Sequence, residues 1–170
     1  MSRMIIKESG MDFIVDSDNV FRIEKTKPAT IMNGVKVAEF AELHLDHLVN
    51  IVEAKSSSPQ PRNSVNFRNF IDEIASKLSD SLLIINALRL NRFQNINCPD
   101  FPQSMRQAHF SLVMKYHLFL VIKGHEKGWL PPLQDALVDR MSAILQMWNI
   151  QSSSVKVIND VMARDMGLIV

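Results

Sequence analysis

The stretch that decides the fold runs from Val49 to Ser57 and reads Val-Asn-Ile-Val-Glu-Ala-Lys-Ser-Ser. Its first half is apolar and partly β-branched, which is typical of a buried strand. Its second half ends in Glu53-Ala54-Lys55. Residues two apart on a strand point to the same face of the sheet. A carboxylate and an ammonium group are therefore expected side by side at the end of a hydrophobic strand, as a metal-dependent site for cleaving phosphodiesters requires.

A second acid, Glu39, lies 14 residues upstream in the strand-like run 37–43. We expect this run to form a hairpin with residues 48–55 through a short turn at 45–47. A turn centred on Asp46 has an odd number of residues and places Glu39 directly across from Glu53. Cross-strand partners lie about 4.5–5.5 Å apart at Cβ, so the two carboxylates could share one cation. A two-residue turn would instead send Glu39 to the opposite face of the sheet.

The chain before this hairpin is expected to form another one. The runs 11–15 and 20–24 are apolar, and Asp16-Ser17-Asp18-Asn19 between them is typical of a turn. Residues 25–36 form a polar connection with room for one short helical turn.

The chain after residue 55 alternates between helical and strand-like patterns. Apolar residues recur at helical spacing over 65–92, which predicts a long amphipathic helix, and prolines 99 and 102 mark the loop 95–102. A strand-like segment over 109–124 has a continuously apolar centre at 118–122, typical of a strand buried on both faces. A helix is expected from about Leu130, then a strand over 154–158 and a short helix that Gly167 ends.

This order predicts the α/β class: a mixed central sheet with two N-terminal hairpins, a long helix, and then strand, helix, strand, helix. The second half favours parallel pairing through right-handed crossovers. With 170 residues we expect a single domain over 1–170.

Composition narrows the function classes. The net charge is +1 and the pI is about 7.9, so no overall charge favours nucleic acid or membranes. The one cysteine, Cys98, excludes an intrachain disulfide. The N-terminus lacks the apolar core of a signal peptide and no uncharged apolar run approaches the roughly 20 residues of a membrane span. We expect a cytoplasmic protein that does not enter a membrane.

Two antiparallel strands that carry an acid and then Glu-x-Lys, followed by a helix and a buried strand, resemble the PD-(D/E)xK nuclease superfamily, which has the restriction-endonuclease-like fold. The residues that match are Glu39, Glu53 and Lys55, and the likeness covers about residues 20–123. The chain departs from the usual pattern at its first acid, which is Glu rather than Asp. It also lacks a helix before the first hairpin to carry an additional acid. Glu24 and Glu8 are the candidates for that acid, and Glu24 is preferred because it ends a strand.

The resemblance implies a catalytic set of Glu39, Glu53 and Lys55. Mg²⁺ or Mn²⁺ would be held by Glu39, Glu53, the backbone carbonyl of Ala54 and Glu24, since hard cations take oxygen ligands. Lys55 would orient a water or offset charge on the phosphate. The expected substrate is DNA, with RNA as the alternative, and a second copy of the chain or a partner protein would provide specificity. Four basic residues are expected to contact phosphates: Lys25, Lys36, Arg62 and Arg68.

Other interpretations stay open. Glu53 and Lys55 could face water on an ordinary surface strand, or the fold could serve as a catalytically inactive interaction module. His44, Asp46 and His47 offer zinc ligands, although a solvated turn explains them as well. Trp129 and Trp148 are expected to anchor helix packing rather than to stack on bases.

Overall fold

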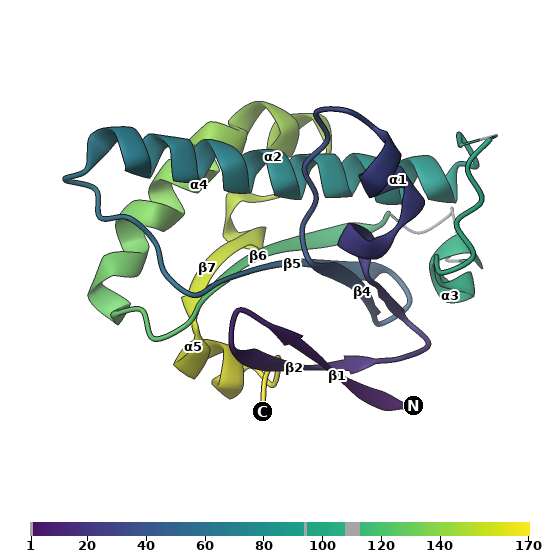
Figure 1. The fold of residues 1–170 in the computed structure, drawn as a ribbon, viewed down its shortest axis with the longest axis horizontal. Coiled ribbons are helices and arrows are strands. Elements are labelled where there is room, and N and C mark those ends of the chain that lie inside the picture. Colours follow the sequence, from purple (N-terminus) through teal and green to yellow (C-terminus); the bar gives the residue numbers. More distant parts are fainter. Residues whose placement is uncertain (1, 94, 108–112) are drawn as a thin grey trace.

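We describe a computed structural model of the chain, covering residues 2–93, 95–107 and 113–170. Its centre is a five-stranded mixed sheet with the strand order β3-β4-β5-β6-β7 (Figure 1). The strands are β3 (Val20–Phe21), β4 (Phe40–His44), β5 (Leu48–Lys55), β6 (Lys115–Ile122) and β7 (Val155–Asn159). The first three pair antiparallel, whereas β5, β6 and β7 run parallel. The predicted α/β class with a mixed sheet is confirmed.

The hairpin of β4 and β5 has the predicted register. Ala41 lies opposite Ile51 and Leu43 opposite Val49, joined by a three-residue turn in which Leu45 has a positive φ of 55°. The ladder ends where Phe40 pairs with Val52, and Glu39 lies at a bend just before β4, where its amide donates to the carbonyl of Val52 at 3.1 Å. Glu53 lies on the same face of the sheet as Val49 and Ile51, because residues two apart on a strand share a face.

Two long helices cover that face. The helix α2 (Ser64–Arg89) connects β5 to β6, and α4 (Leu130–Met147) connects β6 to β7. The two crossover connections have the same handedness, and both move along the sheet in the same direction, from β5 to β6 and then to β7. Both helices therefore lie on one side of the sheet, as Figure 1 shows. Ile74, Leu78 and Leu82 of α2 are fully buried against Ile51 and other inward residues of the sheet. The predicted long helix is confirmed to within a few residues at each end.

The remaining helices are short. They are the α-helices α1 (Lys27–Ile31), α3 (Gln103–Gln107) and α5 (Asp160–Asp165) and the 3₁₀ turns η1 (Ile23–Lys25), η2 (Lys127–Trp129) and η3 (Ser152–Ser154). The helix α5 begins after Asn159, whose side chain accepts a hydrogen bond from the amide of Met162 at 2.9 Å. None of the helices in the described residues combines the length and hydropathy that a bilayer crossing requires.

The prediction for the first hairpin was wrong. The strand β2 (Met11–Asp16) pairs with β1 (Arg3–Glu8), and β3 joins the main sheet instead. The reason is the Ser9-Gly10 turn, where both residues have positive φ, 50° and 73°, so the strands reverse in two residues. The polar residues after β2 lead into β3, which pairs with β4 of the main sheet. The run 20–24, predicted to be the second strand of the first hairpin, forms β3 and the start of η1.

The hairpin β1–β2 and the helix α5 cover the other face of the sheet (Figure 1). There Phe13 packs edge-to-face on Phe40, with 5.4 Å between ring centroids. Because both faces are covered, residues 118–122 of β6 are all buried, as predicted. Residues 109–112, where the strand was expected to begin, fall outside the described residues, and β6 itself starts at Lys115.

Candidate active site

Glu53 is the most unusual side chain of the sheet because it is an acid with no exposed surface. It lies near the end of β5 and faces α2, like Val49 and Ile51 before it. Its Oε1 accepts a hydrogen bond from Lys77 Nζ at 2.8 Å and lies 3.2 Å from Lys55 Nζ. Its Oε2 is buried and has no hydrogen-bond partner. This oxygen has lone pairs open to a water or a cation.

The charges around Glu53 alternate. Lys77 comes from α2, and Lys55 also contacts Glu73 of α2 at 3.0 Å, so the order is Lys77, Glu53, Lys55, Glu73. Burial raises the pKa of the Glu53 carboxyl, and the two ammonium groups oppose that rise. Burial also acts to lower the pKa of Lys55, but its contacts with Glu73 and Glu53 outweigh it and the pKa is raised. Lys55 therefore stays charged beside a carboxylate that water does not reach.

Glu39 lies just before β4 and is held by both sheet and helix. Its amide donates to Val52, and the preceding amide, of Ala38, donates to Ser81 Oγ of α2 at 2.8 Å. The pKa of Glu39 is raised to about 8, first by burial, then by a hydrogen bond with Glu24, and then by the negative charge of Glu53. At neutral pH, Glu39 thus holds its proton.

Three acids converge around Glu39. Glu8 at the end of β1, Glu24 in η1, and Glu39 each offer a carboxylate oxygen, and these oxygens lie within 4.8 Å of one another. This is the single group of three or more potential metal ligands among the described residues. Arg22 forms ion pairs with Glu8 at 2.5 Å and with Glu24 at 3.6 Å, and so offsets part of the negative charge.

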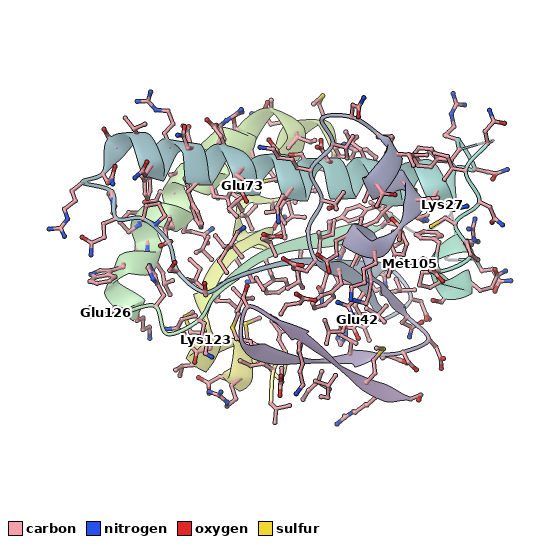
Figure 2. The ribbon with its side chains drawn as sticks, in the orientation of Figure 1. Lys27, Glu42, Glu73, Met105, Lys123 and Glu126 are labelled. Carbon is pink, nitrogen blue, oxygen red and sulfur yellow. The ribbon has the colours of Figure 1, made fainter. Side chains whose placement is uncertain are left out.

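Two further polar groups border the acids. The carbonyl of Ala54 accepts a hydrogen bond from Ser9 Oγ at 3.0 Å, which uses one of its two lone pairs. Lys123 follows β6, its amide donates to the carbonyl of Lys55 at 2.9 Å, and its ammonium lies against Gly10. Figure 2 shows Lys123 beside the tip of the β1–β2 hairpin, below the sheet, and Glu73 on α2 above it. The turn between β1 and β2 therefore lies next to the ends of β5 and β6.

The structure brings Glu24 and Glu39 of the sequence prediction together with Glu8, leaves Glu53 outside that cluster of three, and adds partners that the prediction missed. Glu39 and Glu24 are neighbours, while Glu53 contacts Lys55 and lies near enough to Glu39 to raise its pKa. The four predicted phosphate contacts are all exposed but lie on different elements: Lys25 in η1, Lys36 before β4, Arg62 in the β5–α2 loop and Arg68 in α2. The predicted zinc ligands His44, Asp46 and His47 do not form a ligand cluster within the described part of the chain.

Lys77 is the most important residue that the sequence prediction missed. A signal for it exists, because Glu73 and Lys77 are four apart on α2 and Lys77 borders the buried Ile74 and Leu78. That pattern is common on solvent-facing helices, so only the packing of α2 on β5 identifies Lys77 as a partner of Glu53. Ser9 and Arg22 were missed because their hairpin and turn were assigned incorrectly.

The chemistry available here is that of oxygen ligands beside ammonium groups. Carboxylates and a backbone carbonyl suit Mg²⁺ or Mn²⁺, and the orphaned Oε2 of Glu53 and the proton of Glu39 both fit a site that a divalent cation would complete. Lys55 and Lys77 place fixed positive charge where an anionic group would approach.

Comparisons with known proteins add no family assignment. No protein-family model matches this chain, and neither a curated protein nor a solved structure matches it.

Proposed function

We propose that the protein is a divalent-cation-dependent nuclease that cleaves phosphodiester bonds of DNA, with RNA as the alternative substrate. The observation that carries the proposal is the fully buried Glu53, whose Oε2 has no partner although two lysines and Glu39 surround it. A carboxylate used only for stability would gain from a hydrogen bond on each oxygen. The resemblance to the PD-(D/E)xK superfamily supports the same function, because its acids and lysine fall at Glu39, Glu53 and Lys55.

The residues that would hold the cation are Glu39, Glu53 and the Ala54 carbonyl, with Glu24 and Glu8 beside Glu39. When bound, the ion would lower the pKa of a coordinated water and polarise the phosphate. Glu39 must first lose its proton, so cation binding is expected to release a proton and to strengthen as pH rises toward 8.

Lys55 would hold the attacking water or offset negative charge on the phosphate. It is suited to this because Glu53 and Glu73 fix its ammonium from two sides and keep it protonated. Lys77 would hold Glu53 in place through Oε1, which leaves Oε2 available. Lys77 is therefore a positioning residue, whereas Glu39, Glu53 and Lys55 contact the reacting groups.

A test of this function is cleavage of plasmid and oligonucleotide substrates in Mg²⁺ by the wild type, Glu53→Gln and Lys55→Ala. Each variant should lose at least about a hundredfold in rate, because each removes a fixed charge at the reacting phosphate. Matched controls are Asp139→Asn and Lys27→Ala, which change exposed charges on α4 and α1. Their rates should equal the wild-type rate.

A second candidate is a non-catalytic interaction module that keeps this fold. It is favoured by the chain of ion pairs from Lys77 to Glu73, which already neutralises Glu53 without a metal. Equal cleavage rates for the wild type and both site variants, or no cleavage by any of them, would support the module over the nuclease.

A further inference from the structure

A pocket of about 180 Å³ lies between the β5–α2 loop and the start of α4, outside the acidic site. Its lining residues are Gln60, Pro61, Arg62, Gly128, Trp129 and Pro132. Trp148 packs edge-to-face on Tyr116, with 6.2 Å between ring centroids, as expected of a packing anchor. Trp129 differs, because 43% of its surface is exposed. The expectation that both tryptophans anchor helices therefore holds for Trp148 alone.

The indole ring of Trp129 packs against His125. The ring of His125 meets it edge-to-face, with 5.6 Å between centroids. His125 is in turn held at Nε2 by Ser58 Oγ at 3.2 Å and at its carbonyl by the Asn159 side chain at 2.8 Å. The prolines 61 and 132 stiffen the two walls. The exposed part of the indole ring thus lies in a pocket whose walls are already in place.

The charge in the lining of this pocket is positive, because Arg62 is its charged residue. The loop before Gly128 adds one cation, Lys127, and one acid, Glu126. Proteins that bind single-stranded nucleic acids combine cations along the backbone with aromatic rings on which the bases stack. A pocket of this volume, with an indole ring on one side, suits one planar ring system.

The pocket is also close to the candidate active site. Gln60 follows Lys55 by five residues and so lies at most about 18 Å from it. The walls continue from the ends of β5 and β6, which the hydrogen bond from the amide of Lys123 to the carbonyl of Lys55 holds together. A strand with a phosphate at Glu53 and Lys55 would bring a base a few nucleotides away to Trp129.

We propose that this pocket binds one unpaired nucleobase of the substrate strand, stacked on Trp129, with Arg62 on the adjacent phosphate. A base inside a duplex has both faces covered by its neighbours, so the pocket selects a single strand or an unpaired end. The inference rests on the proposed nuclease function for the identity of the ligand, but its test does not depend on cleavage.

The test is fluorescence titration of Trp148→Phe, in which Trp129 is the remaining tryptophan, in EDTA so that no cleavage occurs. The probes are oligo(dU) and oligo(U), which differ only in the sugar, an abasic strand of equal length, and a duplex. The single strands should quench Trp129, and the abasic strand and the duplex should bind at least about tenfold more weakly. Quenching by either polymer supports the pocket, and the preferred polymer identifies the sugar of the substrate.

Variants measured by anisotropy of a labelled oligo(dU) complete the test. Trp129→Ala should bind about tenfold more weakly, whereas Trp129→Phe should stay within about threefold because it keeps a ring. Leu90→Ala, an exposed apolar change beyond the far end of α2, should bind like the wild type. Wild-type affinity in Trp129→Ala, equal binding of the abasic strand, or no binding of any single strand would overturn the proposal.

The outcomes separate the two proposals. Stacking on Trp129 without Mg²⁺-dependent cleavage would leave the pocket assigned and the nuclease rejected. Cleavage that is unaffected by Trp129→Ala, on single-stranded and duplex substrates alike, would leave the nuclease in place and reject the pocket.

Discussion

Glu53 and Glu39 come from the two arms of one hairpin but have different electrostatic surroundings. Glu53 is completely buried and is compensated by two ammonium groups. Glu39 is half-buried beside two other acids, and a bound proton, rather than an ammonium group, neutralises its charge. Two carboxyls whose surroundings separate their protonation behaviour can serve one site in different roles. Here two ammonium groups would favour the anionic form of Glu53, and Glu39 would exchange its proton for a cation.

Glu39 makes the metal-free protein less stable as pH rises. Its pKa is about 8 in the fold against 4.5 ordinarily, so the stability that its protonated form contributes is complete below about pH 4.5 and is lost as pH rises through 8. Glu39→Gln should remove that loss and be more stable than the wild type above pH 8. The difference should be on the order of 2 kcal/mol, after allowing for solvent screening of a half-buried group.

The measurement is urea unfolding of both proteins in EDTA from pH 5 to pH 9. Their stabilities should agree near pH 5 and diverge steadily up to pH 8. Parallel curves over the whole range would show that Glu39 does not carry the proton.

Lys77→Met should destabilise the fold because Glu53 would lose the closer of its two ammonium partners. Removing one member of a buried ion pair commonly costs about 3–5 kcal/mol, and Lys55 should reduce that loss to roughly 2 kcal/mol. The double variant Lys77→Met, Glu53→Gln should recover much of the loss, because no buried charge then lacks its partner. Urea unfolding at pH 7 compares Lys77→Met, Glu53→Gln and the double variant. If the stability losses of the two single variants add up in the double variant, Lys77 and Glu53 are not coupled.

At the scale of elements, the turn between β1 and β2 ties the hairpin to the site. Gly10 has a φ of 73°, and a Cβ placed there would lie 2.7 Å from Lys123 Nζ. Gly34 has a similar φ of 80° but open space around it, so it is a matched control for backbone strain. The two glycines therefore separate strain from displacement of Lys123.

Gly10→Ala and Gly34→Ala should each cost about 1 kcal/mol, because alanine is strained at positive φ. The stability losses should be similar, since the end of a lysine side chain can move at little expense. Only Gly10→Ala should also weaken binding of nucleic acid, because it displaces the Lys123 ammonium. Thermal unfolding measures the stability losses, and oligonucleotide titration measures the binding. Equal binding by the two variants would show that Lys123 does not contribute to binding nucleic acid.

At the scale of the whole molecule, the site lies where three layers meet. Glu8 comes from the β1–β2 hairpin, Glu39 and Glu53 from the central sheet, and Glu73 and Lys77 from α2. The layers are held by two cores on opposite faces of the sheet. A cation that joins acids of different layers would stabilise the molecule as a whole.

Mg²⁺ or Mn²⁺ should therefore raise the melting temperature. At a hundred times Kd the gain is about 2.7 kcal/mol, which corresponds to roughly 5–10 °C for a chain of this size. Glu53→Ala should abolish the rise, and the rise in the wild type should be larger at pH 8 than at pH 6. NaCl at matched ionic strength is the control for charge screening, and a rise of the same size in NaCl would count against the site.

The long helices α2 and α4, the buried strand β6 and the register of the β4–β5 hairpin could be predicted because they depend on local properties. Periodicity identifies α2 and β6, and the three-residue turn at 45–47 sets Ala41 opposite Ile51 and Leu43 opposite Val49. The first hairpin could not be predicted in the same way. Its two candidate partners for β2 are both apolar, and the choice depends on the positive φ of Ser9 and Gly10.

The amino-acid sequence by itself determined which strand carries the acid and the lysine, since strand alternation is a property of neighbouring residues. The tertiary structure alone decided that Lys77 reaches Glu53, that Glu8 and Glu24 join Glu39, and that Trp129 remains exposed beside Arg62. Those contacts join separate elements, and their positions are set by how the helix layer and the hairpin layer pack on the two faces of the sheet. No spacing along the chain encodes that packing.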